Sequence, residues 1–130
     1  MSENVELVRR GYEAWQAGDL GRAMAGFDDE MVTRRFVPAL QGTWHGKEGF
    51  LEVVGDWVAT FDDFEMSAEE FLDAGDRVLV HVIQRGHGEG GGVPVESSFW
   101  FLHTIRDGRV VAFDLYASER QAREAAGLDE

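Results

Sequence analysis

Cysteine is absent from the 130 residues of the sequence. This absence excludes a disulfide scaffold, a thiol nucleophile and a zinc site built on thiolates. Four histidines remain, at positions 45, 81, 87 and 103, and their spacing matches no known metal-binding motif. We therefore expect neither a metal ion nor another cofactor. A chain of this length can bury a core without cross-links, and we expect one domain over residues 1–130.

Basic residues are scarce as well. Twelve Lys and Arg stand against 25 Asp and Glu, which gives a formal net charge of −13. Binding to nucleic acid depends on clustered basic side chains that neutralise phosphates, so we expect no nucleic-acid partner. The acids are spread along the chain, as is typical of a solvated surface that favours solubility.

Long apolar stretches are also missing. None approaches the roughly 20 residues needed to span a bilayer, so we expect no membrane partner. The N-terminus reads Met1-Ser2-Glu3-Asn4 and carries neither a basic segment nor an apolar export sequence. The sequence therefore predicts a cytoplasmic protein.

Helical spacing is clear in the N-terminal part of the chain. Val5, Val8, Tyr12 and Trp15 recur at intervals of three or four residues and form one apolar stripe. Gly18 is a natural end for this first helix. The further helices that we expect cover residues 20–27, 47–60 and 119–126.

Strand-like patterns rich in Val, Ile and Phe occupy most of the remaining sequence. We expect strands over residues 31–37, 64–72, 77–87, 93–105 and 109–117. The glycine run at 86–92 predicts a turn rather than a phosphate loop, because it lacks the Gly-Lys-Ser/Thr ending and no helix follows it. Helices and strands that are segregated in this way are typical of an α+β fold.

Four segments of the sequence stand out as motifs: VRRGYEAWQAGDL from Val8, WHGKEG from Trp44, DAGDRV from Asp73 and RDGRV from Arg106. Together they resemble SnoaL-like proteins of the nuclear transport factor two-like (ketosteroid isomerase-like) superfamily, over almost the whole chain. The resemblance implies a cone-shaped α+β roll, with three N-terminal helices packed on a strongly curved antiparallel sheet around one small-molecule pocket. It implies no single function, because unrelated isomerases, cyclases, dehydratases, epoxide hydrolases and binding subunits share this scaffold.

Alternation along the strands predicts which side chains face the pocket. We assume that the glycine-rich turn is symmetric about Gly90 and that residues 106–108 form a three-residue hairpin loop. One face of the sheet then carries His81, Ile83, Arg85, Ser97, Phe99, Phe101, His103, Val111, Phe113 and Leu115. The resemblance implies that this concave face meets the helices. The residues expected to close the pocket walls are Tyr12, Trp15, Phe27, Arg34, Phe36 and Trp57.

His81 and His103 are the candidate catalytic residues. A neutral imidazole donates and accepts hydrogen bonds, and its pKa suits acid–base work near neutral pH. A histidine on an apolar strand is also often a hydrogen-bonded core residue, so both interpretations stay open. Arg34 is a candidate for binding a carboxylate or enolate, or for pairing with one of the many acids, and its neighbour Arg35 should point the other way.

Two chemistries implied by the resemblance lack their residues here. The ketosteroid isomerase mechanism needs a carboxylate base where this sequence has Arg34, and a buried acid on strand 93–105, whose predicted pocket face has none. The epoxide hydrolase mechanism needs two inward aspartates beside an arginine, and we find no such pair. One remaining hypothesis is a lyase, isomerase or cyclase that acts by general acid–base chemistry on a small carbonyl or aromatic compound. The other is a non-catalytic ligand-binding or dimeric interaction module.

The opposite face of the sheet predicts a partner. We expect it to carry Val80, Val82, Trp100, Leu102, Ala112 and Tyr116, with nothing left in the chain to cover them. An exposed apolar patch of this kind usually marks an interface, and dimers joined through the sheet are common in the superfamily. We therefore expect a homodimer, because burial of large side chains outweighs the screened repulsion between two acidic chains.

Overall fold

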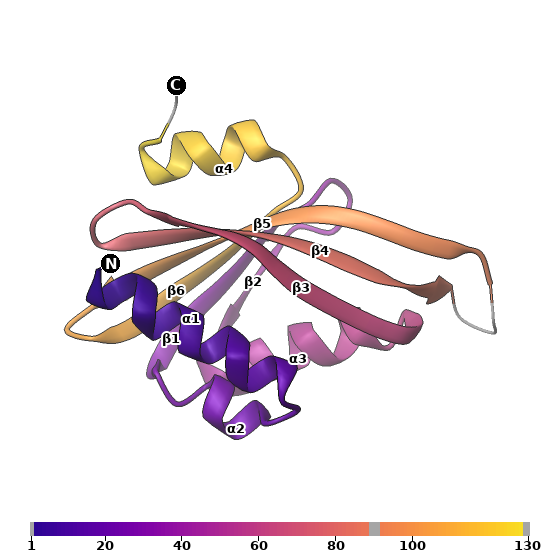
Figure 1. The fold of residues 1–130 in the computed structure, drawn as a ribbon, viewed down its shortest axis with the longest axis horizontal. Helices are drawn as coiled ribbons and strands as arrows, with labels where there is room; N and C mark the ends of the chain where they lie inside the picture. The colour runs from indigo at the N-terminus through magenta and orange to yellow at the C-terminus, as the bar shows by residue number, and fades with distance from the viewer. Residues whose placement is uncertain (1, 89–91, 129–130) are drawn as a thin grey trace.

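The computed structural model describes residues 2–88 and 92–128 of the chain. The strands of this part are β1 (Phe27–Phe36), β2 (Gly42–His45), β3 (Phe61–Asp73), β4 (Arg77–Gly88), β5 (Pro94–Arg106) and β6 (Arg109–Tyr116). The helices are α1 (Glu3–Gln16), α2 (Leu20–Ala23), α3 (Gly46–Val58) and α4 (Glu119–Ala126). Helices α1, α2 and α3 lie on the concave side of one curved sheet, and α4 lies on the convex side (Figure 1).

The predicted α+β class and the packing of three N-terminal helices on a curved sheet are confirmed. The prediction of a purely antiparallel sheet is wrong, because β1 pairs with β6 in parallel. The strand order is β2-β1-β6-β5-β4-β3, so that β2 and β3 form the two edges. Alternation of apolar and polar residues contains no information about strand direction, which explains why the sequence did not reveal the parallel pair.

Caps define the ends of the helices. The Ser2 hydroxyl accepts a hydrogen bond from the Val5 backbone N–H at the start of α1, and the Ser118 hydroxyl does the same for Gln121 in α4. The expected helix over residues 20–27 is wrong in length, since α2 has only four residues. The chain leaves it early because Phe27 already pairs with β6 as the first residue of β1.

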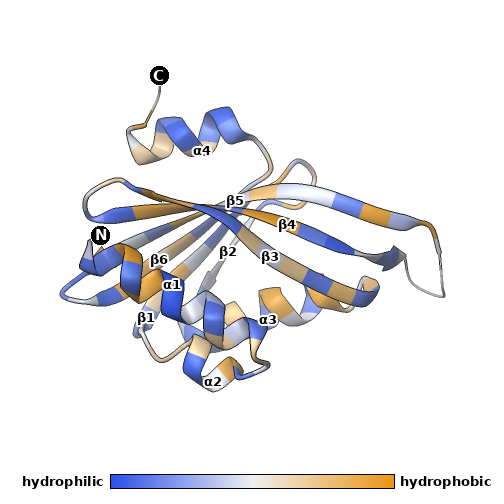
Figure 2. Ribbon diagram, in the orientation of Figure 1, coloured by the Kyte–Doolittle hydropathy of each residue, from blue (hydrophilic) through white to orange (hydrophobic). Residues whose placement is uncertain are grey.

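The register between β4 and β5 differs by one residue from the symmetric turn that we expected. Val80 lies opposite Phe101 and Val82 opposite Phe99, and this pairing continues to His87 and Pro94. Gly90, the predicted centre, lies outside the described residues. A slip of one residue exchanges the two faces of a strand. The even-numbered residues Val78, Val80 and Val82 of β4 therefore face the helices. Apolar and polar residues both occur along the strands (Figure 2).

The second predicted turn also differs. Arg106 pairs directly with Arg109, so that Asp107 and Gly108 form a two-residue turn, and both have positive φ, at 54° and 76°. Asp-Gly is a favoured sequence for such hairpins. The register then shifts after Thr104, which brings Val110 into the core as well as Phe113.

The face assignment for β1 requires the same kind of correction. Met31 and Thr33 are fully buried on the concave side. Arg34 and Phe36, which we expected in the pocket wall, point to the convex side instead. The Phe36 ring stacks on Tyr116 at 4.9 Å. The Arg34 guanidinium donates hydrogen bonds from Nε and Nη2 to the two carboxylate oxygens of Asp114, at 2.7 and 2.8 Å.

Helix α4 covers part of the convex face, contrary to the expectation that nothing would cover it. Ala122 and Ala126 pack against Leu79, Leu102 and Tyr116 in one buried cluster. Of the predicted interface residues, Val80 and Val82 lie on the other side of the sheet and are fully buried in the main core. The sequence predicted this short helix, but its pattern of residues did not reveal that the helix folds back over the sheet.

The Arg34–Asp114 pair generates a prediction about stability. Burial raises the pKa of Asp114, while the hydrogen bonds from Arg34 lower it. Arg34→Gln leaves the buried carboxylate with a weaker partner. We expect a loss of about 1–3 kcal/mol, less than the ~3–5 kcal/mol of a fully buried pair, because the Arg34 side chain is 44% exposed. Urea unfolding at pH 7 measures the loss. Asp114→Asn in the same chain should restore part of it, and wild-type stability of Arg34→Gln would contradict the assigned pairing.

Candidate functional site

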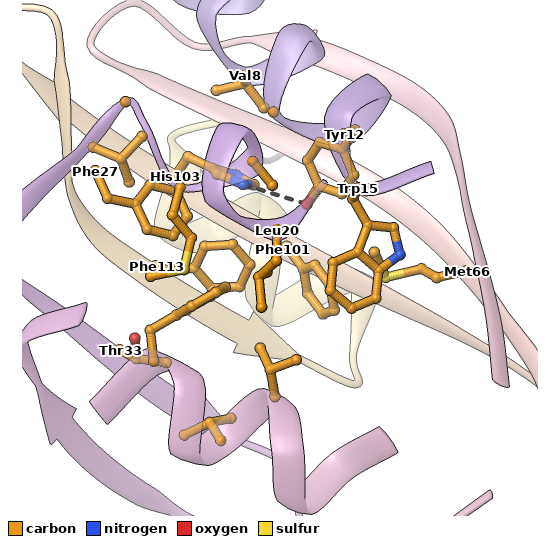
Figure 3. A pocket seen from close by; sticks show the side chains of 18 of the residues that line it. Val8, Tyr12, Trp15, Leu20, Phe27, Thr33, Met66, Phe101, His103 and Phe113 are labelled. Atoms are coloured by element: carbon orange, nitrogen blue, oxygen red, sulfur yellow. Dashed lines mark hydrogen bonds between the residues drawn. The ribbon is translucent and has the colours of Figure 1, made fainter. Parts of the chain in front are cut away.

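A cavity of about 290 Å³ lies between the helices and the concave face of the sheet (Figure 3). Its walls are mostly aliphatic and aromatic side chains. The predicted pocket residues that the structure places in these walls are Tyr12, Trp15, Phe27, Trp57, Phe101, His103, Phe113 and Leu115. They come from α1, β1, α3, β5 and β6, so that distant parts of the sequence meet at this site.

Other predicted pocket residues lie elsewhere. His81, Ile83 and Arg85 are on the convex side, because the register of β4 reverses its faces. The His81 ring stacks on Trp100 at 5.0 Å and its Nε2 lies 3.1 Å from the Ser98 hydroxyl.

The remaining predictions on β4 and β5 also fall outside the cavity lining. The Arg85 side chain pairs with Glu96 at 2.9 Å in solvent. Ser97 and Phe99 lie on the same side of β5 as Phe101, but neither borders the cavity. Phe99 packs edge to face on Trp57, with ring centroids 5.2 Å apart. The candidate catalytic pair of histidines is therefore reduced to His103.

Tyr12 and His103 form a hydrogen-bonded pair at the wall of the cavity. The distance from the Tyr12 hydroxyl to His103 Nε2 is 3.3 Å, and Figure 3 shows the two side chains directed toward each other. His103 Nδ1 lies 3.3 Å from the carbonyl oxygen of Val78. A carbonyl only accepts, so Nδ1 carries the proton and donates it there. Nε2 consequently presents its lone pair to the Tyr12 hydroxyl, which donates.

Burial keeps both members of this pair uncharged. It lowers the pKa of His103 to about 4, although backbone hydrogen bonds with Val78 and Phe101 oppose this shift. It also raises the pKa of Tyr12 well above its ordinary value. The apolar surroundings disfavour the imidazolium and the phenolate alike. At neutral pH the cavity therefore presents a neutral imidazole and a neutral phenol.

Thr33 and Gln84 are polar residues of the cavity wall that the sequence did not reveal. Gln84 Oε1 accepts a hydrogen bond of 2.6 Å from the indole N–H of Trp57. The hydroxyl oxygen of Thr33 is buried and has no hydrogen-bond partner among residues 2–88 and 92–128. A buried hydroxyl without a partner costs about 1–3 kcal/mol, so it is an available group for a ligand. If the predicted strand had begun at Phe27, alternation would have placed Met31 and Thr33 on the same face as Phe27, toward the cavity.

The guanidinium on the helix side of β1 belongs to Arg35, which points away from Arg34 as expected. It lies over the rings of Trp44 and Trp57, with centroids at 4.8 and 5.7 Å. Arg35 itself is outside the cavity lining. Its cation–π contact helps to hold the Trp57 ring in place.

Comparison with known families assigns this architecture. The SnoaL-like domain family matches residues 8–113, which is most of the chain. The chain belongs to the SnoaL-like domain family. No curated protein matches this SnoaL-like chain in sequence.

Solved structures with the same fold cover nearly the whole SnoaL-like chain. An NTF2-like protein of unknown function from Burkholderia pseudomallei K96243 has 23% identity and a TM-score of 0.76, over 95% of this chain and 97% of its own. TerC, co-crystallised with polyporic acid, has 20% identity and a TM-score of 0.77, over 97% and 99%. A putative SnoaL-like polyketide cyclase from Mesorhizobium loti has 19% identity and a TM-score of 0.70, over 89% and 99%. At these identities the likeness establishes the fold alone.

Two further observations concern the described residues of the SnoaL-like chain. None of their helices is long and apolar enough to cross a membrane. Within residues 2–88 and 92–128, no three His, Asp or Glu side chains are grouped closely enough to hold a metal ion.

The buried imidazole of the SnoaL-like chain predicts a pH-dependent stability. His103 titrates near 6.5 when unfolded but stays neutral down to about pH 4 when folded. Between these values the unfolded chain binds more protons, so the free energy of unfolding decreases as the pH falls. We expect His103 to contribute a decrease on the order of 2 kcal/mol between pH 7 and pH 5.

The variant His103→Gln isolates this contribution, because glutamine fills similar space and does not titrate. Urea unfolding of both proteins at pH 7 and pH 5 should show a smaller decrease for the variant. Carboxylates elsewhere titrate equally in both proteins and cancel in the comparison. Equal decreases in the two proteins would show that His103 is not held neutral by burial.

Proposed function

We propose that this SnoaL-like chain binds a small, largely apolar carbonyl or aromatic compound in the cavity and acts on it by general acid–base chemistry. The observation that carries the proposal is the Tyr12–His103 pair, whose imidazole is neutral and oriented by the Val78 carbonyl. A fixed tautomer with a lone pair on Nε2 is the form in which histidine accepts a proton.

The walls of the cavity favour a flat, apolar ligand. Aromatic rings from α1, α3, β1, β3, β5 and β6 border the space. Phe113 contacts the rings of Phe27, Phe50 and Phe101 with centroids 5.1–6.3 Å apart. A volume of about 290 Å³ is near the lower limit of ordinary ligand cavities. A compound of one or two fused rings is of suitable size, and Thr33 is a hydrogen-bonding group for an oxygen on it.

The proposed step is proton transfer from a carbon beside a carbonyl group. The C–H proton moves to His103 Nε2, the C–H electron pair forms the enolate, and the Tyr12 hydroxyl turns to donate a hydrogen bond to the enolate oxygen. Return of the proton to another carbon completes an isomerisation. In an elimination the enolate expels a leaving group from the β-carbon, and this group takes the proton. In a ring closure the enolate carbon attacks a second carbonyl group of the same compound, whose oxygen takes the proton. An imidazole with a pKa of about 4 is a weak base, so the C–H must be acidic, as it is between two carbonyl groups.

The second candidate function is ligand binding without chemistry. One observation favours it: Tyr12 and His103 already satisfy each other, and both are packed on phenylalanine rings. The His103 ring lies 4.7 Å from Phe113, and the Tyr12 ring lies 5.7 Å from Phe71. In this case the pair would only provide polarity at one end of an apolar cavity.

Benzoylacetone distinguishes the two functions, because it combines an aromatic ring with a C–H between two carbonyl groups. Binding is measured by quenching of the fluorescence of Trp15 and Trp57, which line the cavity. Proton exchange at the central carbon is followed by NMR in D₂O. We expect wild-type protein to bind the compound and to accelerate exchange about 10²–10⁴-fold.

The variants separate binding from proton transfer. His103→Gln should abolish the acceleration while binding stays within a few fold, and Tyr12→Phe should reduce it in part. Arg34→Gln, on the convex face, is the matched control and should exchange at the wild-type rate. Binding without acceleration would favour the non-catalytic function, and an absence of binding would contradict both.

We also propose that two copies of the chain form a homodimer through the part of the convex face that α4 leaves open. Trp100 remains partly exposed there, beside the stacked His81 ring and Ile83. Large aromatic side chains that stay in contact with water are typical of interfaces. The cytoplasmic location stays a prediction.

The dimer proposal predicts the effect of Trp100→Glu, which places a charge in the interface. Light scattering should give twice the monomer mass for wild type at moderate salt, and the monomer mass for the variant. Trp100 also packs against the cluster under α4, so circular dichroism must confirm that the variant stays folded. A wild-type protein that is monomeric at high concentration would refute the dimer.

A further inference from the structure

The exposed residues of the cavity lining are all in one short part of the chain. Among the described residues that line the cavity, those classed as exposed are Arg10, Leu20, Arg22 and Ala25. They belong to α1, α2 and the loop that follows α2. The other walls consist of buried or partly buried residues. The cavity therefore meets solvent beside the contact of α1 and α2, where a Cβ atom on Gly11 would lie 3.3 Å from the Ala23 carbonyl oxygen.

Two arginines frame this opening, and the described lining contains no Asp, Glu or Lys. The lining is therefore basic, although the whole chain is acidic, with 25 acids and 12 basic residues. The basic side chains elsewhere are mostly engaged with acids or carbonyl oxygens. The basic side chains that form such an ion pair or hydrogen bond are Arg9, Arg34, Arg35, Lys47, Arg77, Arg85, Arg120 and Arg123.

Arg10 and Arg22 form no ion pair or side-chain hydrogen bond within residues 2–88 and 92–128. Of the acids near them in sequence, Glu6 pairs with Arg9 at 3.6 Å, and the Asp19 carboxylate accepts from the Arg22 backbone N–H as the cap of α2. Glu13, three residues after Arg10 in α1, is exposed. Among the described residues, the only other arginines whose side chains form neither an ion pair nor a hydrogen bond are Arg106 and Arg109, at the tip of the β5–β6 hairpin. Two of the four unpaired arginines therefore border the cavity.

We infer that the ligand is an amphipathic acid: an apolar ring system that fills the cavity and a carboxylate or other anionic oxygen group that lies at the opening between Arg10 and Arg22. This inference rests on the proposed function and adds the chemical class of the ligand. A guanidinium offers several N–H donors in a planar array that fits a carboxylate. The uncharged Tyr12–His103 pair then meets the part of the ligand that carries no charge.

The net charge of −13 repels an approaching anion, whereas Arg10 and Arg22 attract it at the opening. The strengths of the two interactions must therefore be compared. Charges more than about 8 Å away are largely screened at physiological salt. A bound carboxylate at the opening would interact at close range with two guanidinium groups, and the described lining of the cavity contributes no acidic side chain that would repel it. The local attraction wins. It also orients the ligand, because only the charged end gains by staying at the surface.

The inference is tested with 1-naphthaleneacetate and 1-naphthaleneacetamide, two probes of the same shape that differ in charge. We expect the acetate to bind roughly three- to tenfold more tightly, the effect of one or two partly exposed ion pairs. The double variant Arg10→Gln/Arg22→Gln should lose this preference while its Kd for the acetamide stays within about twofold. Arg106→Gln/Arg109→Gln is the matched control, since it removes the same charge from unpaired arginines away from the cavity, and it should keep the preference.

A salt titration provides a second measurement that needs no variant. The advantage of the acetate should disappear near 1 M salt, where the Debye length is about 3 Å, whereas acetamide binding should stay unchanged. Equal affinities for the two probes, or a preference that persists in Arg10→Gln/Arg22→Gln, would overturn the inference and leave the proposed cavity intact. If neither probe binds, the cavity itself is not a ligand site and both proposals fall.

Discussion

The register between β4 and β5 determines what the cavity of this protein contains. These two long strands are neighbours in the sheet, and every side chain on β4 changes sides when the pairing shifts by one residue. With Val78 opposite His103, the Val78 carbonyl is in position to accept a hydrogen bond from Nδ1–H, and Val80, Val82 and Gln84 follow on the same face of β4. With the other register, His81 and Arg85 would project among phenylalanines. The pairing thus keeps one imidazole inside and leaves the other imidazole in contact with Trp100 near solvent.

The sheet holds two polar pairs on its opposite faces, and their charge states differ because their access to water differs. Tyr12 and His103 are enclosed by apolar side chains and remain neutral, which avoids the large cost of burying an unpaired charge. Asp114 is also buried, but its partner Arg34 is 44% exposed and donates two hydrogen bonds. An ion pair is tolerated there because one member still contacts water. The neutral Tyr12–His103 pair therefore faces the cavity, and the charged Arg34–Asp114 pair lies on the other face, between β1 and β6.

Local signals in the sequence predicted the elements better than their faces. The bounds of α4 agree with the expectation, because Ser118 and Gly127 are strong caps at its two ends. The stripe of Val5, Val8 and Tyr12 correctly gave the buried side of α1. The face of β4 depended on the number of residues in a glycine-rich turn, where no side chain marks the pairing. The side of the sheet to which Arg34 points could be assigned only by extending β1 back to Phe27. The packing of α4 on the convex face is a tertiary contact. Long-range pairing decides such features, and short-range periodicity does not reveal them.

The order of the strands gives the acidity of the chain a physical role. An edge strand exposes unpaired N–H and C=O groups to which the edge of another sheet can add, and proteins prevent this with short strands, bulges or charges. At one edge, β2 is only four residues long. At the other, the 13-residue β3 has two irregularities in its pairing with β4 and exposes six acids: Asp62, Asp63, Glu65, Glu69, Glu70 and Asp73. A second β3 laid against this edge would bring twelve carboxylates together along one ladder. The open sheet thus resists growth into a fibre through electrostatic repulsion at the strand that is otherwise long enough to start one.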